Sequence, residues 1–292
     1  MKIAIYIAFN NSSSVICCKE VIDIVSEEND IIIDSKIKND LSKELQHKFS
    51  FFDSSEPIDN NIDYIFAVGG DGTILRSITY VKDSGIPILG INAGRLGFLT
   101  SVQKENIDQA VNKLKEKKFS VIDRTLLEVK SYSASKLFSY ALNEVTIQRK
   151  DSTSLLNISC MINDDYLTNY WSDGLIISTP TGSTGYSLSN GGSVVSPESK
   201  VIILNPIAPH NINMRSLIIP DDSEVKIQVD GTDNINLSLD SRMYSFESKN
   251  EIQISKSKFT IKTIKLDDDN FYKRLREKLF WGQDMRNSKV SD

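Results

Sequence analysis

The chain has 292 residues, of which 40% are hydrophobic, so it can bury a substantial core in one large domain or two ordinary ones. Its formal charge of −5 disfavours a nucleic acid or an anionic membrane as a partner, because both attract basic surfaces, and no apolar run approaches the roughly 20 residues of a membrane-spanning helix. Cys17, Cys18 and Cys160 form neither a zinc motif nor a disulfide framework, so we expect three packing residues in a cytoplasmic protein.

The first 118 residues alternate short apolar segments with amphipathic ones. The pattern predicts strands at 3–8, 30–34, 64–68 and 86–91, and helices at 14–27, 36–49, 73–82 and 104–118. Strands that alternate with helices form a parallel sheet that is covered on both faces. We therefore expect a Rossmann-like α/β domain over residues 1–118.

A glycine-rich turn, Gly69-Gly70-Asp71-Gly72-Thr73, follows the third of these strands. Ligands of open parallel sheets bind beyond the carboxyl ends of the strands, and glycine lets backbone N–H groups approach a phosphate. A carboxylate beside phosphate needs a chemical reason: Asp71 either accepts a proton from an attacking hydroxyl or shares a divalent metal with the phosphates. An ordinary turn is the alternative, because Gly and Asp dominate turns. A second glycine-bearing loop, residues 92–99, is expected at the same edge of the sheet.

From Phe119 onward the apolar residues alternate with period two, which predicts an all-β domain of many short strands over residues 119–267. The segment from Phe271 to Trp281 instead has the spacing of an amphipathic helix. We expect this helix, within residues 268–292, to pack back on the α/β domain and to bury Leu275, Leu279 and Phe280.

The β half contains a dense run of Gly, Ser, Thr and Asn between Asp173 and Gly192. Such a segment offers backbone N–H and hydroxyl donors to phosphate or sugar oxygens, with a flexible linker as the alternative. The adjacent Asn143 and Glu144 lie in a segment that is predicted to form a strand. An amide beside a carboxylate suits a ribose diol, although a solvated strand edge would use the same residues.

Three motifs in this order resemble those of the NAD kinases: the glycine turn at 69–73, Asn143-Glu144, and Asp173-Gly174 followed by residues 179–189. The glycine turn alone is shared with diacylglycerol and sphingosine kinases and, more loosely, with phosphofructokinases. The Thr-Pro-Thr-Gly-Ser-Thr segment is much more specific. The resemblance implies an α/β domain, a β-sandwich-like domain and a final helix that returns to the first domain.

The resemblance also implies roles for individual residues. Asp71 would be the catalytic base for the 2′-hydroxyl of the adenosine ribose of NAD. The implied dinucleotide contacts are Asp71, Gly72, Phe98, Asn143, Glu144, Asp173, Thr181, Thr184, Gly185, Tyr186, Ser187, Leu188 and Ser189. Arg76, one helical turn beyond Asp71, is a further candidate for a phosphate or dinucleotide contact, with a solvated helix residue as its alternative. No metal-ligating residues are predicted.

The sequence departs from the family pattern at three positions. Gly185 replaces a frequent alanine, Trp171 stands where many bacterial members have a basic residue, and Arg242 replaces the glutamine of an Asp-Gly/Ser-Gln motif. At Arg242, the sequence leaves open an arginine that neutralises phosphate.

The sequence thus predicts an ATP:NAD 2′-phosphotransferase that uses ATP, or polyphosphate, and a divalent metal, Mg²⁺, to make NADP. It contains no Walker A motif, so the donor phosphates would be held without a P-loop lysine. The alternatives are a lipid kinase on the same scaffold and a catalytically silent dinucleotide-binding regulatory module. We expect a homo-oligomer, a dimer or tetramer, with no nucleic-acid or membrane partner.

Overall fold

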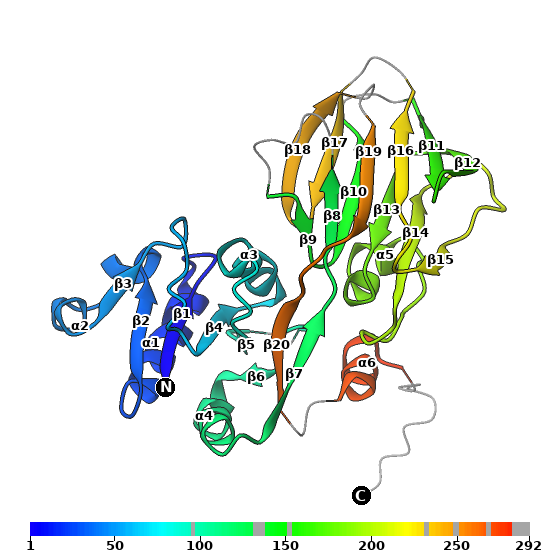
Figure 1. Cartoon of the computed structure of the whole chain (residues 1–292). Helices are drawn as coiled ribbons and strands as arrows, with labels where there is room; N and C mark the ends of the chain where they lie inside the picture. The colour runs from blue at the N-terminus through cyan, green and yellow to red at the C-terminus, as the bar shows by residue number, and fades with distance from the viewer. Residues whose placement is uncertain are drawn as a thin grey trace, which may run out of the picture. The chain divides into compact units, whose positions relative to one another are not determined.

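The computed structural model describes residues 1–94, 97–130, 138–150, 154–230, 234–247, 251–266 and 270–281. Two compact units make up the chain (Figure 1). The α/β unit comprises Met1–Ile74, Ile86–Ile122 and Thr263–Asp292, and the β unit comprises Leu75–Gly85 and Asp123–Lys262.

An eight-stranded sheet forms the centre of the α/β unit, in the order β3-β2-β1-β4-β5-β20-β7 with β6 paired to β5. Its strands are β1 (Lys2–Tyr6), β2 (Asp30–Asp34), β3 (Ser50–Phe52), β4 (Tyr64–Gly69), β5 (Ile88–Asn92), β6 (Val102–Gln103), β7 (Phe119–Arg124) and β20 (Ile261–Leu266). The pairings from β3 through β5 are parallel, as the alternation of strands and helices predicts. The helices are α1 (Ser12–Val25), η1 (Ser35–Asp40), α2 (Lys43–Lys48), α3 (Asp71–Val81), η2 (Lys104–Asn106), α4 (Ile107–Lys115) and α6 (Phe271–Leu279).

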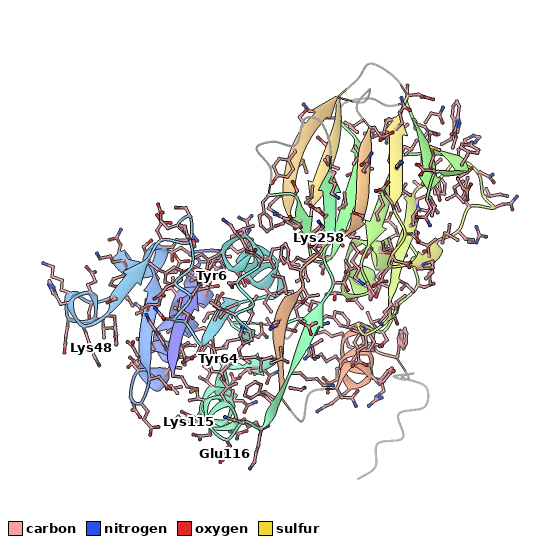
Figure 2. All side chains as sticks on the ribbon, viewed as in Figure 1. Tyr6, Lys48, Tyr64, Lys115, Glu116 and Lys258 are labelled. Atoms are coloured by element: carbon pink, nitrogen blue, oxygen red, sulfur yellow. The ribbon has the colours of Figure 1, made fainter. Side chains whose placement is uncertain are left out.

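The core of the α/β unit lies between the sheet and the helices α1 and α4. Both cysteines of α1 are buried there, and Cys160 is buried in the β unit; all three are free thiols, so the expectation of packing residues is confirmed. Tyr64 at the start of β4, which Figure 2 labels, makes an edge-on ring contact with Phe119 at the start of β7. In the described part of the chain, no helix has the length and apolar character needed to cross a bilayer.

Apart from shifts of a few residues at helix ends, the predictions for two helices differ from the structure. The helix expected over residues 36–49 is two short pieces, η1 and α2, because Leu41 is extended and the hydroxyl of Ser42 caps a new helix by accepting a hydrogen bond from the Leu45 N–H. At α6, Leu275 is buried, but Phe280 is 67% exposed, so the prediction that Phe280 is buried is wrong. Phe280 has a left-handed backbone at the end of the helix, which takes its side chain off the apolar face.

The β unit consists of two antiparallel six-stranded sheets, in the orders β15-β14-β13-β10-β17-β18 and β12-β11-β16-β19-β8-β9 (Figure 1). The first sheet has β10 (Glu144–Arg149), β13 (Gly174–Ser178), β14 (Val201–Ile207), β15 (Leu217–Pro220), β17 (Asn234–Leu239) and β18 (Arg242–Glu247). The second has β8 (Leu127–Lys130), β9 (Tyr140–Ala141), β11 (Leu156–Ile162), β12 (Asp165–Ser172), β16 (Val225–Val229) and β19 (Ile252–Lys256). Two short helices, η3 (Thr181–Thr184) and α5 (Tyr186–Ser189), follow β13.

Apolar side chains of both antiparallel sheets form one core, for example Val145 and Ile147 from β10 with Ile227 from β16 and Ile254 from β19. This arrangement is a β-sandwich, and the predicted fold class is confirmed. The strands β7 and β20 follow the period-two pattern of the β half, but they join the sheet of the α/β unit.

Candidate functional site

The glycine turn joins β4 directly to α3. Gly69 has φ +152°, and a Cβ at this position would lie 2.1 Å from the hydroxyl oxygen of Thr73, so the turn requires glycine there. The helix begins at Asp71, two residues before the predicted start at 73. Asp71 therefore stands in the first turn of a helix, at the carboxyl end of a central parallel strand, where ligands of such sheets bind.

The second glycine-bearing loop holds the Asp71 carboxylate. Oδ2 accepts a hydrogen bond from the N–H of Phe98 (2.7 Å), and Oδ1 accepts hydrogen bonds from the N–H groups of Leu99 and Thr100 (3.0 Å each). A Cβ at Gly97 would lie 1.8 Å from Oδ1, so the loop can approach this closely only with glycine at 97. The three N–H groups fix the orientation of the carboxylate, and among the described residues Oδ2 accepts only one bond. A lone pair of Oδ2 is therefore available to an incoming hydroxyl.

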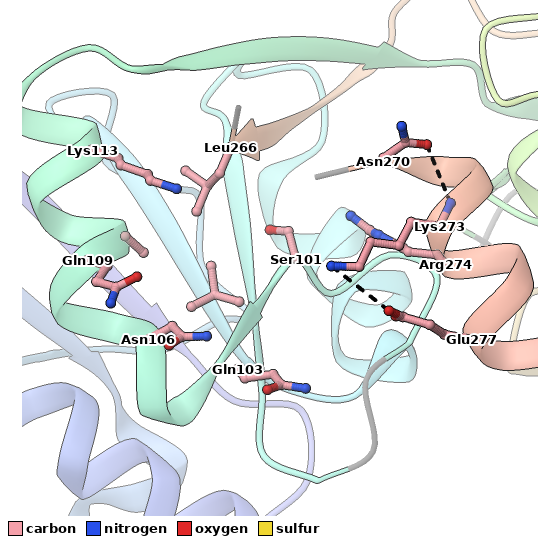
Figure 3. Close-up of a pocket in the computed structure, with 12 residues that line it drawn as sticks. Ser101, Gln103, Asn106, Gln109, Lys113, Leu266, Asn270, Lys273, Arg274 and Glu277 are labelled. Atoms are coloured by element: carbon pink, nitrogen blue, oxygen red, sulfur yellow. Dashed lines mark hydrogen bonds and ion pairs between the residues drawn. The ribbon is translucent and has the colours of Figure 1, made fainter. Parts of the chain in front are cut away.

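The helix α6 contacts the loop that holds Asp71, through the backbone carbonyl of Phe98. Arg274 is 8% exposed, and its guanidinium donates a hydrogen bond to the carbonyl of Phe98. Figure 3 shows the neighbouring pocket, of about 360 Å³, with Arg274 and Lys273 of α6 on one side and α4 on the other. Through Phe98, the final helix is linked to the atoms that hold Asp71.

In the β unit, Asn143 and Glu144 lie at the start of β10, and the segment after β13 packs against them. The N–H of Thr179 donates to the carbonyl of Asn143 (2.9 Å), and the Thr179 hydroxyl donates to the carbonyl of Leu142 (2.6 Å). A Cβ at Gly182 would lie 2.1 Å from the Asn143 carbonyl oxygen, so this contact requires glycine. The Thr-Pro-Thr-Gly-Ser-Thr segment thus packs against the chain at Leu142 and Asn143 and contains η3, with α5 directly after it. The alternative of a flexible linker is wrong.

Two buried oxygens at the start of β10 have no hydrogen-bond partner among the described residues: Oδ1 of Asn143 and Oε2 of Glu144. Buried polar atoms in folded proteins are almost always hydrogen-bonded, so such a pair marks a place for a bound ligand or water. Burial, with a smaller contribution from the nearby Asp240, raises the pKa of Glu144 to about 7, although the backbone N–H of Tyr186 opposes the shift. A carboxyl group that is short of partners and titrates near neutrality is typical of a binding site.

Position 185 lies beside these two side chains. A Cβ there would be 2.9 Å from Glu144 Oε2 and 3.3 Å from the amide nitrogen of Asn143. Gly185 therefore leaves more room next to the unpaired oxygen than alanine would.

The remaining predicted residues fall into different surroundings. Thr181 is buried in η3, and Thr184, Tyr186, Leu188 and Ser189 are partly or well exposed. Ser187 is fully buried, and its carbonyl accepts a hydrogen bond from the side-chain amide of Asn205 (2.9 Å), so its side chain faces the interior of the β unit.

Asp173 lies at the opposite end of the β10–β13 pair from Glu144. Glu144 pairs with Ser178, whereas Gly174 pairs with Gln148, a separation of roughly 13 Å along the strand at about 3.3 Å per residue. The Asp173 carboxylate forms an ion pair with Arg149 (3.3 Å). Within one chain, Asp173 is therefore not a neighbour of Glu144.

Arg242 and Arg76, the two arginines considered as phosphate contacts, have different surroundings in the structure. The guanidinium of Arg242 donates hydrogen bonds to the carbonyls of Phe138 and Tyr140 and lies 4.9 Å from the centre of the Phe138 ring. These contacts occupy much of the guanidinium, and neutralisation of a phosphate by Arg242 stays a prediction. Arg76, half-buried on α3, lowers the pKa of Arg242 through charge repulsion, as a minor cause beside burial.

Two clusters are also shaped by residues whose roles were not predicted from the sequence: Gly97, Thr100, Thr179 and Asp240. The glycines of the loop at 92–99 were a usable signal for the first pair, and the specific motif at 179–184 for the third. Nothing in the local sequence of Asp240 indicates its partners, which are about a hundred residues away in the chain.

A carboxylate on a glycine turn at the end of a parallel strand, combined with a polar site in an antiparallel sandwich and no P-loop, defines a class of small-molecule kinases. Two family models match the chain: the ATP-NAD kinase N-terminal domain over residues 9–119 and the ATP-NAD kinase C-terminal domain over residues 142–266. The chain belongs to the ATP-NAD kinase family.

Relatives support the same assignment over nearly the whole length. The chain is 45% identical to the NAD kinase of Flavobacterium psychrophilum over 98% of its own residues and 100% of that protein, and 37% identical to the NAD kinase of Porphyromonas gingivalis over 88% and 89%. Among solved structures, yeast NADH kinase complexed with NADH has a TM-score of 0.85 at 25% identity, covering 99% of this chain and 90% of that one. An NAD kinase from Archaeoglobus fulgidus in complex with ATP has a TM-score of 0.72 at 26% identity, covering 96% and 98%.

Proposed function

We propose that this protein transfers the γ-phosphoryl group of ATP to the 2′-hydroxyl of the adenosine ribose of NAD, giving NADP and ADP. The observation that carries the proposal is the Asp71 carboxylate, which is oriented by three backbone N–H groups at the carboxyl end of a parallel strand. An ordinary turn needs no such arrangement. Membership of the ATP-NAD kinase family supplies the substrate class.

In the proposed step, Asp71 acts as the general base. A ribose hydroxyl has a pKa far above 7, so the carboxylate orients the O–H and accepts its proton as the new O–P bond forms. The bond from the γ-phosphorus to its bridging oxygen breaks, and ADP leaves. Oδ2 is the acceptor in this proposal, because Oδ1 already accepts two backbone hydrogen bonds.

The dinucleotide is held by the cluster around Glu144 in this proposal. Its ribose hydroxyls would donate to Glu144 Oε2 and Asn143 Oδ1, the two buried oxygens without partners among the described residues. Tyr186 and the residues around Gly185 would contact the rest of the nucleoside, with Gly72, Arg76, Phe98, Thr181, Thr184, Leu188 and Ser189 as further contacts.

A divalent metal fits this site only as a companion of the nucleotide. Among the described residues no three His, Cys, Asp or Glu side chains gather into a metal site. Mg²⁺ commonly keeps several waters and binds through one or two carboxylates plus substrate phosphates. We assign no side chain of this chain to the metal, because Asp71 serves as the base in this proposal; the metal would bind the donor phosphates and neutralise charge on the transferred phosphoryl group.

Two other features of the proposal concern the assembly and its place in the cell. The separation of Asp173 from Glu144 within one chain supports a homo-oligomer, because a second subunit could bring its Asp173 to the site. The dimer or tetramer and the cytoplasmic location stay predictions.

The test is product identification with a panel of acceptors and donors. The purified protein is incubated with Mg²⁺ and ATP or polyphosphate, and with NAD, NADH, a diacylglycerol or sphingosine, and the phosphorylated product is identified. We expect NADP from NAD and ATP. A phosphorylated lipid would assign the chain to the rival kinase class, and NAD binding without turnover would indicate a regulatory module.

A further inference from the structure

A carboxylate from the β17–β18 hairpin ties down the chain at the start of β10. Asp240 accepts hydrogen bonds from the N–H groups of Leu142 (3.0 Å), Asn143 (2.7 Å) and Glu144 (3.3 Å), and its own N–H donates to the Glu144 carbonyl (2.9 Å). Its side chain is only 1% exposed. A buried carboxylate needs such donors, so this contact is a specific one and not an incidental surface contact.

Arg242, on the other side of the same hairpin, fixes Asp240 in turn. One guanidinium nitrogen lies 3.4 Å from Asp240 Oδ2, and the group also donates to the carbonyls of Phe138 and Tyr140. The planar fork of arginine can serve several acceptors at once, which the glutamine common at this position in the family cannot do with a charge. Asp240 and Arg242 together link the hairpin to the segment that leads into Asn143 and Glu144.

We propose that Asp240 is a positioning residue of the dinucleotide site: by holding the backbone of Leu142–Glu144, it directs Asn143 Oδ1 and Glu144 Oε2 toward the ribose. This inference rests on the proposed function. Both oxygens are buried without partners among the described residues, and they flank the segment that Asp240 holds. Thr179 and Gly182 hold the carbonyl side of the same segment, so the pair is fixed before a ligand arrives.

Asp240 also acts on the charge of the site. Among the described residues, the Asp240 carboxylate and the N–H of Tyr186 act on the Glu144 carboxyl, while Arg242 faces Asp240. The negative charge of Asp240 adds to burial in raising the pKa of Glu144. Because ribose hydroxyls donate to the ionised carboxylate, the pH at which NAD binds depends on Asp240 as well as on Glu144.

The experiment compares Asp240→Asn with wild type in steady-state kinetics and in NAD binding between pH 5.5 and 8.5. Asparagine keeps the shape but loses the charge and one acceptor oxygen. We expect the KM for NAD to rise about tenfold, kcat to change less than threefold, and the midpoint of the pH dependence of NAD binding to move to lower pH. A purely structural role would not move this midpoint.

Asp221→Asn is the matched control, because Asp221 is also a largely buried carboxylate with a basic partner, Lys256, at 2.7 Å. It should leave the KM and the midpoint unchanged. If Asp240→Asn does not fold, Arg242→Gln supplies the test, with an expected rise of at least about threefold in the KM for NAD. Wild-type KM values in whichever variant folds would overturn the inference, whereas a wild-type protein that cannot phosphorylate NAD would overturn the proposed function instead.

Discussion

Two aspartates in this protein are held in the same way but serve different ends. Asp71 in the α/β unit and Asp240 in the β unit each accept hydrogen bonds from three consecutive backbone N–H groups. Asp240 is buried and has Arg242 beside it, whereas Asp71 is only partly buried at the end of a strand. The same device therefore orients a partly exposed carboxylate in one unit and fixes a stretch of backbone in the other, and only the partly exposed carboxylate of Asp71 is accessible from outside the unit.

The largest expected effect tests the proposed role of Asp71 as the general base. Asp71→Asn keeps the shape of the side chain but removes its basicity, so turnover should fall by at least about 100-fold, the lower end of the range for a general base. NAD affinity and the melting temperature should stay near the wild-type values. Steady-state kinetics, a calorimetric NAD titration and thermal unfolding measure these three quantities, and wild-type turnover in the variant would remove Asp71 from the mechanism.

The next prediction concerns the cost in stability of burying Glu144 in the β unit, with Asp240 nearby. The pKa of Glu144 is raised to about 7 in the folded protein from an ordinary value of 4.5, so the folded state binds the proton more tightly and loses stability as the pH rises from 4.5 through 7. Glu144→Gln removes this loss. The variant should be more stable than wild type at pH 8, by an amount on the order of 3 kcal/mol, and the difference should shrink toward pH 5. Urea unfolding at several pH values measures it, and a difference that does not depend on pH would contradict it.

Asp71 and Asp240 also show what the sequence alone could predict. The spacing of apolar residues predicts the strand before Asp71 and the helix after it, and the glycines of residues 92–99 indicate a second loop at the same edge. The ends and caps of helices were harder to predict from the sequence. Ser42 divides a predicted helix because its hydroxyl accepts a hydrogen bond from a backbone N–H group, and the hydrophobic pattern, which is continuous there, does not reveal this cap. Asp240 could not be found in this way, because its partners at 142–144 meet it only through the pairing of β10 with β17.

The third prediction concerns the binding of NAD by Glu144. If Glu144 accepts hydrogen bonds from the ribose, Glu144→Ala should weaken NAD binding by about 1.5–3 kcal/mol, the range for hydrogen bonds to charged groups. The loss should be larger at pH 8 than at pH 6, because Glu144 is ionised only above its raised pKa. Isothermal calorimetry at the two pH values is the measurement. Unchanged affinity at both would separate Glu144 from the site and leave Asp240 with a structural role.

The smallest expected effect concerns the support behind Asp71. Arg274 donates to the Phe98 carbonyl, and the Phe98 N–H donates to Asp71, so Arg274→Gln should loosen the loop and lower kcat by about three- to tenfold, equivalent to roughly one hydrogen bond. Arg276→Gln on the same helix is the matched control, because Arg276 is exposed and does not line the pocket shown in Figure 3. The two variants should have similar melting temperatures if the arginine acts on the loop and not on the docking of α6. Equal kcat values for both variants would mean that the three backbone N–H groups hold Asp71 without help from the final helix.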